Sequence, residues 1–370
     1  MKANGVILPY VVEKLQTSHT LVAWAFTLQC SLGFLINDLP KFLFCEAPLS
    51  KQLLHYFSYR QLGIVGGFLA GFGYIGSGLL TSSILDHFLF HSMSGFGFGL
   101  LCIPSFMYIH AHVDYQTFAK IQSTAGIFIY VGVAILPLVM KWLIDIYGHN
   151  DGLAIFGALI WNCVLTGVAM RPTESSSLEI ESTSCSTVPR EKLHVSDKYL
   201  PLLSPLFRHR NFAICMLFVT SGMYVYSSWA IFLVSFGNDL GFSSQQSVYL
   251  STAGGVGGAV GSLLPLVLFS YNKMNAYTTC LFPSVANGIT LLLSTFMTDF
   301  TIVFYLMLLS GFIQGFQYAG ICGFIPLLLC EHHLGYGAVL YFLVEGVLYQ
   351  FGGLLPGIAH VKEKEKENLT

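Results

Sequence analysis

The chain has 370 residues, of which 54% are hydrophobic and only 10% are charged, and its mean hydropathy is +0.66. A soluble domain carries about 25% charged residues, so this composition excludes an ordinary soluble protein and indicates a surface that faces lipid. The formal net charge is -2 and no long basic block is present, which excludes nucleic acid as a partner.

Continuously apolar runs alternate with short polar loops along the chain, and each is close to the about 20 residues that span a bilayer as a helix. Runs of this kind predict helices, since barrel strands would be shorter and would alternate in polarity. We therefore expect an all-α polytopic membrane protein with ten full spans. The expected spans are 21–36, 62–80, 88–109, 124–143, 152–170, 212–236, 248–269, 277–296, 303–329 and 336–358.

A polar linker divides these spans into two equal sets, which suggests two related helical bundles. The expected organisation is an N-terminal bundle at 1–170, a linker at 171–210, a C-terminal bundle at 211–360 and a charged tail at 361–370. The linker contains ESSSLEIESTSCST, which is typical of a flexible tether open to phosphorylation or of a simple spacer.

Lysine and arginine residues predict the orientation, because positive loops are retained in the cytoplasm. With the linker cytoplasmic, alternation of the spans puts most loop cations on the same side. Lys14 and Lys141 are the exceptions among the loops, and the lysines of the tail also fall outside.

The cysteines and histidines form no recognisable metal or catalytic pattern. Cysteines such as Cys215 and Cys280 lie inside apolar runs, without CxxC spacing, and are interpreted as small buried hydrophobic residues. His87, His91, His110 and His112 flank one span and are interpreted as interfacial residues rather than a shared metal site. We expect no metal, no cofactor and no enzyme activity.

Several segments resemble the monocarboxylate porters of the major facilitator superfamily. KANGVILPY at 2–10 is similar to the end of that family's first helix, and APLSKQLLHYFSYRQLGIVGG at 47–67 to its loop between helices two and three. GFGFGLLCIPS at 95–105 resembles the fourth helix, and LVEGVLYQFGGLLPG at 343–357 resembles the eleventh. The resemblance implies a major-facilitator-like two-bundle fold at the plasma membrane.

The chain also departs from the family pattern. The first helix is partial and a twelfth helix is missing, so the chain is expected to be truncated at both ends. The family's aspartate and arginine, one turn apart, correspond to Gly257 and Gly261. A neutral, zwitterionic or amine-bearing metabolite is therefore as suitable a substrate as a monocarboxylate.

Ionisable residues at membrane depth are the first candidates for a transport site. Glu345 lies in the middle of an apolar run and is expected either to carry a proton or to stabilise helix packing. By resemblance, Lys2 corresponds to a first-helix lysine implicated in proton and anion binding, or is a terminal charge without function. Other polar residues within the apolar runs are expected either to line the transport path or to form hydrogen bonds with neighbouring helices. These residues are Tyr224, Tyr226, Ser228, Gln314, Gln317, Tyr318 and Asn162.

Pro48 and Arg60 match the family's loop motif, where Arg60 is either a cytoplasmic gate contact or a topological anchor. The resemblance implies a secondary active transporter of small monocarboxylates or related metabolites, proton-linked and working by alternating access. Its partners would be a small organic anion or zwitterion, a proton, the lipid bilayer and a single-span accessory protein. The alternative is a transport-incompetent truncated form that associates with full-length porters or with the accessory protein.

Overall fold

A computed structural model describes residues 2–35, 57–113, 115–170, 210–270, 277–328, 340–341, 343–352 and 354. The regular secondary structure of these residues is entirely helical. The elements are α1 (Lys2–Leu15), α2 (His19–Leu35), α5 (Tyr59–Leu79), α6 (Ile84–His112), α7 (Tyr115–Ile160), η1 (Trp161–Cys163), α8 (Val164–Ala169), α11 (Arg210–Asp239), α12 (Ser244–Ser270), η2 (Tyr277–Leu281), α13 (Phe282–Thr295) and α14 (Phe300–Leu328). Residues 343–352 are also helical and are called the Glu345 helix below.

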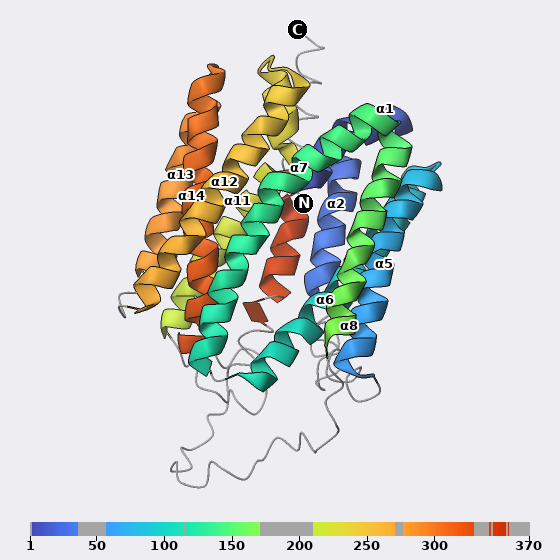
Figure 1. The fold of residues 1–370 in the computed structure, drawn as a ribbon. Coiled ribbons are helices and arrows are strands. Elements are labelled where there is room, and N and C mark those ends of the chain that lie inside the picture. The colour runs from blue at the N-terminus through green and yellow to red at the C-terminus, as the bar shows by residue number, and fades with distance from the viewer. Residues whose placement is uncertain are drawn as a thin grey trace, which may run out of the picture.

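The expected all-α membrane fold is confirmed. Within the described residues, five helical stretches are long and apolar enough to cross a bilayer: Tyr59–Leu79, Thr124–Ala169, Arg210–Asp239, Ser244–Leu268 and Phe300–Ile321. The helices stand side by side in one bundle (Figure 1). The chain is an integral membrane protein, while the total of ten spans stays a prediction.

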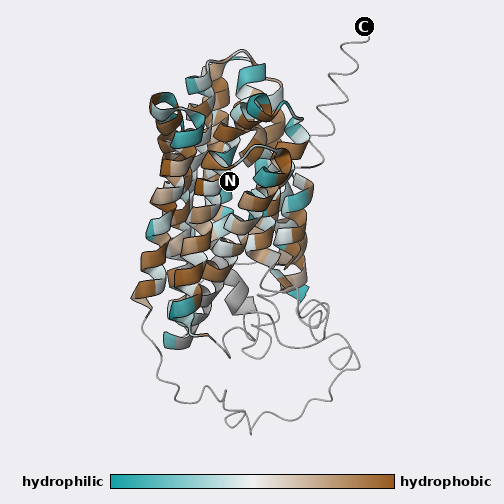
Figure 2. Cartoon of the chain, turned by 90° about the vertical axis from the view of Figure 1, so that its right-hand side faces the viewer, coloured by the Kyte–Doolittle hydropathy of each residue, from teal (hydrophilic) through white to brown (hydrophobic). Residues whose placement is uncertain are grey.

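Large apolar side chains cover the outer surface of the bundle. Leu85, Phe128 and Leu217 are 75%, 72% and 66% exposed, an arrangement that is stable only where the surroundings are as apolar as the side chains. Hydrophobic positions predominate along the helices, and hydrophilic positions gather mostly towards the two ends (Figure 2). This distribution is the one that a lipid-embedded bundle requires.

Helix α7 is two helices joined at Gly148, whose backbone has φ 79° and ψ 175°. This positive φ is a conformation that glycine adopts without a steric penalty. The chain passes along the bundle through the first part of α7 and returns through the second part (Figure 1). The spans expected at 124–143 and 152–170 therefore adjoin each other, with little loop between them.

Two helices of the first half begin with a capping box, in which the side chain and backbone of two residues bond each other reciprocally. Ser58 and Gln61 cap α5, and Ser83 and Asp86 cap α6. These bonds satisfy amide groups that an α-helix leaves free in its first turn. They set where each helix starts after its preceding loop.

Helices α12 and α14 pack closely on each other in the second half. A Cβ atom added at Gly257 or Gly261 would collide with the backbone carbonyl of Leu308 or Phe312 in α14. Small residues let helices approach closely in lipid, where apolar burial gives little drive for association. The glycines that stand in place of the family's charged pair thus form a tight helix contact.

The two halves of the chain meet along several helix pairs. Helix α1 packs on α11, and the first part of α7 packs on α12 and α14. Helices α2, α5 and α6 lie on one side of Figure 1, and α12, α13 and α14 on the other. A further crossing lies between α2 and the Glu345 helix, where Trp24 Nε1 donates to Gln350 Oε1 over 2.9 Å.

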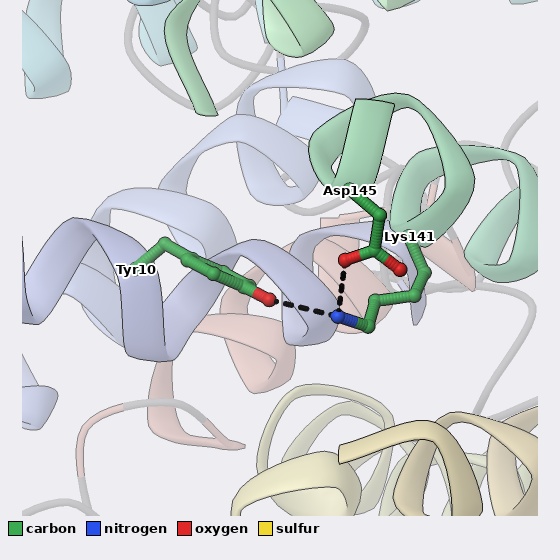
Figure 3. Close-up of polar contacts among 3 residues, drawn as sticks. All are labelled: Tyr10, Lys141 and Asp145. Atoms are coloured by element: carbon green, nitrogen blue, oxygen red, sulfur yellow. Dashed lines mark hydrogen bonds and ion pairs between the residues drawn. The ribbon is translucent and has the colours of Figure 1, made fainter. Parts of the chain in front are cut away.

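Lys141 links α1 to α7. Its ammonium lies 2.6 Å from a carboxylate oxygen of Asp145, one turn later in α7, and donates to the hydroxyl of Tyr10 over 3.1 Å. Figure 3 shows the lysine reaching between the two other side chains. The ion pair thus neutralises the lysine locally while the tyrosine holds the shorter helix in place.

Candidate functional site

A cavity of about 190 Å³ lies between the two halves of the bundle. This volume is below the about 300 Å³ at which pockets for drug-sized ligands begin, so the cavity suits a small solute. Helices α2, α7, α11, α14 and the Glu345 helix all contribute to its wall. The described lining residues are Phe34, Ile129, Tyr130, Gly222, Tyr226, Gln314, Gln317, Tyr318, Ile321, Glu345 and Tyr349.

Glu345 is the one acidic residue among the described lining residues, and its side chain is only 4% exposed. No lysine or arginine belongs to the same described set. Tyr349 follows one helical turn later and packs against Phe34 of α2 with ring centroids 5.5 Å apart. The wall is therefore apolar and phenolic, with a single carboxyl group as its charge-bearing element.

Two glutamines of α14 contribute amide groups to the cavity. Gln317 Nε2 donates to Ser284 Oγ in α13 over 2.7 Å, which fixes the orientation of this amide. Gln314 is 8% exposed, and its Nε2 group has no hydrogen-bond partner within the described structure. A buried amide without a partner loses about 1–3 kcal/mol, so a polar solute that accepts this hydrogen bond would be stabilised.

The cavity brings together five of the residues expected to form the site: Glu345, Tyr226, Gln314, Gln317 and Tyr318.

The other candidates are placed elsewhere in the described structure. The hydroxyl of Ser228 donates to the carbonyl of Tyr224 within α11, and neither residue lines the cavity. Asn162 is exposed and donates to the carbonyl of Leu159. Arg60 is exposed in the first turn of α5. Lys2 begins α1, but its side chain lies outside the described structure, as does Pro48.

Sequence reasoning did not single out Tyr130 and Tyr349, the remaining phenols of the wall. The spacing of Tyr349 from Glu345 could have identified it, because residues four apart lie on the same helix face and Glu345 was already a candidate. Tyr130 had no such signal. It reaches the cavity because Gly258 leaves room beside its ring, where a Cβ atom would collide.

A second buried polar cluster joins the helices of the first half. Asn4 donates to Gln29 Oε1 over 2.8 Å and accepts from the hydroxyl of Tyr74 over 2.9 Å. Gln29 in turn donates to Ser94 Oγ over 3.0 Å. These bonds connect α1, α2, α5 and α6, and they satisfy polar groups that lipid could not solvate.

His87 and His91, which were interpreted as interfacial residues, are enclosed by the bundle, and their depth in the bilayer stays a prediction. Both are only 1% exposed, and their rings lie 4.1 Å apart, one turn from each other in α6. His87 Nδ1 lies 3.2 Å from Ser77 Oγ, and His91 Nδ1 lies 3.1 Å from the carbonyl of His87. In the described part of the chain, no group of three potential metal ligands comes together.

A bundle of lipid-facing helices in two sets, with a small and mostly apolar cavity between the sets, is typical of a carrier-type membrane protein. A family model described as the Major Facilitator Superfamily matches residues 1–353. The chain belongs to this superfamily. Membership agrees with the expectation that the protein is a carrier and not an enzyme.

Curated relatives support the resemblance to monocarboxylate porters. The chain is 25% identical over 305 residues to monocarboxylate transporter 4 of Mus musculus, which covers 81% of this chain and 60% of the relative. It is 24% identical over 255 residues to monocarboxylate transporter 4 of Gallus gallus, covering 68% and 49%. It is 26% identical over 235 residues to monocarboxylate transporter 12 of Xenopus laevis, covering 59% and 49%. The chain thus spans about half to three-fifths of the length of these relatives.

The fold is also similar to that of a solved transporter. A crystal structure of the nucleoside transporter NupG matches with a TM-score of 0.63 at 14% identity, covering 96% of this chain and 86% of the other. At this identity the match concerns the fold alone.

Proposed function

We propose that this chain is a secondary active transporter that moves small monocarboxylates or related small metabolites together with a proton. It works by alternating access at the plasma membrane, with the central linker in the cytoplasm. The observation that carries the proposal is the position of Glu345 in a cavity whose wall comes from both halves of the bundle. Solute sites of major facilitator transporters lie near the bilayer midplane between the repeats.

The charge of Glu345 couples the proton to the solute. An ionised Glu345 repels a carboxylate at close range, whereas a protonated Glu345 donates a hydrogen bond to it. A monocarboxylate is therefore bound only together with a proton. After the cavity opens to the other side, release of the proton leaves an ionised Glu345 that repels the carboxylate, and release of the carboxylate in turn makes ionisation of Glu345 easier.

Neutral donors bind the solute in this scheme. The free amide of Gln314, the hydroxyl of Tyr226 and the carboxyl of Glu345 supply hydrogen bonds from α14, α11 and the Glu345 helix. Gly257 and Gly261 face the backbone of α14 so closely that neither position has room for a cationic side chain. A carboxylate therefore gains no ion pair from that part of α12, which keeps zwitterionic, neutral and amine-bearing solutes within the substrate class.

Alternating access requires that contacts between the halves break on one side of the cavity at a time. The bond between Trp24 and Gln350 is one such contact. Trp24 is in the part of α2 that follows the short turn after α1, which the proposed topology assigns to the outer side. The bond then closes the outer path and breaks when the cavity opens outward.

Uptake into proteoliposomes tests the proposal. The purified chain is reconstituted, a pH gradient is imposed, and entry of labelled monocarboxylates, zwitterions, amines and neutral metabolites is measured. We expect acid outside to drive accumulation of at least one monocarboxylate. Glu345→Gln should abolish the response to the gradient while exchange of solute across the membrane continues, because glutamine binds the solute but carries no proton.

Glu13→Gln is the matched control, since the same chemical change falls on an exposed residue at the end of α1. It should leave the gradient response unchanged. Absence of flux for the whole panel would refute transport by this chain. A gradient response that survives in Glu345→Gln would refute the role of this carboxyl group.

A further inference from the structure

Two buried cysteines from distant parts of the sequence touch each other in the second half. Cys280 Sγ in η2 donates to Cys215 Sγ in α11, and the sulfur atoms are 3.1 Å apart across a separation of 65 residues. Cys215 is 1% exposed and Cys280 is 0% exposed. The expectation that these cysteines are small buried residues is met, but the sequence contained no sign that they adjoin.

The contact needs little movement to become a covalent bond. A disulfide joins its sulfur atoms at about 2.05 Å, so an approach of about 1 Å brings this pair together. One partner lies in η2, a short π-helical segment. Such segments interrupt the regular hydrogen bonding of a helix and often occur at functional sites, so the backbone around Cys280 can adjust more readily than that of a continuous α-helix.

The cysteine pair is connected to the cavity through Gln317. The amide of Gln317 lies 3.5 Å from the carbonyl oxygen of Cys280 and 2.7 Å from Ser284 Oγ. Ser284 also donates to the carbonyl of Phe218, one turn after Cys215 on α11. A bond between the sulfur atoms would therefore add to an existing contact between α11 and α13 that borders a lining residue.

We propose that Cys215 and Cys280 form a reversible disulfide that fastens α11 to η2 and α13 at the edge of the cavity. The oxidant is a peroxide. One thiol loses its proton, and the thiolate attacks hydrogen peroxide. The O–O bond breaks, a sulfenic acid forms, and the departing hydroxide takes up the proton and leaves as water. The second thiol attacks the sulfenic sulfur, the S–S bond forms and a second water leaves. The two thiols lose two electrons and the peroxide gains them.

The burial of both sulfur atoms favours a small, uncharged oxidant. Both sulfur atoms are enclosed, so a small uncharged molecule reaches them more readily than a large charged disulfide such as oxidised glutathione. Reduction returns two thiols by exchange with two molecules of a small thiol, which form a mixed disulfide with the protein and then leave as their own disulfide. Disulfides of this transient kind are the ones found in proteins that face a reducing cytoplasm.

The consequence for transport rests on the proposed function. Helix α11 belongs to the cavity wall through Tyr226, and α14 through Gln317. If the second half must rearrange around the solute during the cycle, a covalent link between α11 and α13 opposes that movement. The oxidised protein then binds solute but turns over slowly.

Peptide mapping of the full chain in membranes tests the bond without reference to transport. The membranes are treated with hydrogen peroxide, remaining thiols are alkylated, and the digest is searched for a linked pair of peptides. We expect a peptide joining Cys215 to Cys280 with a mass about 2 Da below the sum of its parts, for the two hydrogens lost. The link should disappear after treatment with dithiothreitol.

Variants separate this pair from the other cysteines. Cys215→Ala and Cys280→Ala should each abolish the linked peptide, whereas Cys163→Ala removes a cysteine of η1 and should leave the link intact. Proper folding of each variant is checked by size-exclusion chromatography. Absence of the linked peptide under peroxide that oxidises other cysteines of the chain would overturn the proposal, as would pairing of Cys280 with a different cysteine.

Flux measurements test the effect on the cycle. Peroxide should lower uptake because the disulfide blocks a conformational step, and dithiothreitol should restore it. In Cys215→Ala, peroxide should have no such effect. An equal loss of uptake in the variant would overturn the regulatory role. A linked peptide in a chain that carries no solute would leave the disulfide standing and refute the transport function instead.

Discussion

Ser31 in α2 donates its hydroxyl hydrogen bond to the backbone carbonyl of Gly346, 2.6 Å away in the Glu345 helix. Ser31 is fully buried, and the bond crosses from the first half of the chain to the second. Because Gly346 is the next residue after Glu345, this contact contributes to the orientation in which the carboxyl group meets the cavity.

Removal of this bond should weaken the link between the halves. For Ser31→Ala we expect a loss of about 0.6 kcal/mol, the average for hydrogen bonds between helices in a membrane, and a correspondingly lower midpoint of thermal unfolding in detergent. Ser105→Ala is the control, because the Ser105 hydroxyl donates to the carbonyl of Leu101 in its own helix. An equal decrease of the thermal midpoint in the two variants would show that the hydrogen bond between the halves contributes no more to stability than a bond within one helix.

Close packing of α12 on α14 should make Gly257 intolerant of any side chain. A methyl group at this position collides with the carbonyl of Leu308, and overpacking of this kind costs about 1–3 kcal/mol. Gly257→Ala should therefore lower the thermal midpoint clearly. Gly288→Ala in α13 is the matched control, since nothing lies within 4 Å of the added atom, and its effect should stay within about 0.5 kcal/mol.

The polar cluster of the first half should respond to substitution in a defined order. Asn4→Leu removes both the donor to Gln29 and the acceptor for Tyr74, and each buried polar group left unpaired costs about 1–3 kcal/mol. Tyr74→Phe removes one donor and should cost less. Thermal unfolding measures both, with Asn162→Leu on the exposed surface as the control. A smaller loss for Asn4→Leu than for Tyr74→Phe would contradict the network.

Acid should remove the contribution of Asp86 to the start of α6. Asp86 precedes the apolar span expected from residue 88, and hydrogen bonds from Ser82 and Ser83 hold the pKa of its carboxyl below the ordinary value of 3.8. A pKa lowered by folding means that the stabilisation is present above 3.8 and is lost as the pH falls through the folded value.

The thermal midpoint of the native chain should therefore exceed that of Asp86→Asn at neutral pH, and the difference should shrink once the pH falls below 3.8. Asp151→Asn, at an exposed aspartate of α7, is the comparison. If the difference in thermal midpoint between the native chain and Asp86→Asn stays constant down to the lowest pH, the ionised carboxyl of Asp86 does not stabilise the start of α6.

Much of the fold was predictable because lipid imposes a simple rule on the sequence. Uninterrupted apolar runs must form helices, since no water is present to bond a free backbone. Residues such as Ser58 and Gln61, with the spacing of a capping box, mark a helix start locally. The polar linker between two equal sets of spans suggested two bundles, and the family resemblance implied the same arrangement.

The site was predictable only in part. Glu345 stood out because an acid within an apolar run is rare and costly. Gln314, Gln317 and Tyr226 were candidates on the same ground, but so were Asn162 and Ser228, which lie away from the cavity. A polar residue in a membrane helix faces a cavity, a neighbouring helix or the outer surface, and its type does not distinguish these positions.

By itself, the sequence determined that this protein is a bundle of membrane helices, because the length and polarity of each run are local properties read one segment at a time. Only the tertiary structure decided which residues share the cavity with Glu345, that Gly257 and Gly261 seal a helix contact, and that Cys215 meets Cys280. These are relations between segments far apart in the chain. They depend on the rotation of each helix about its axis, which is set by the packing of all its neighbours together.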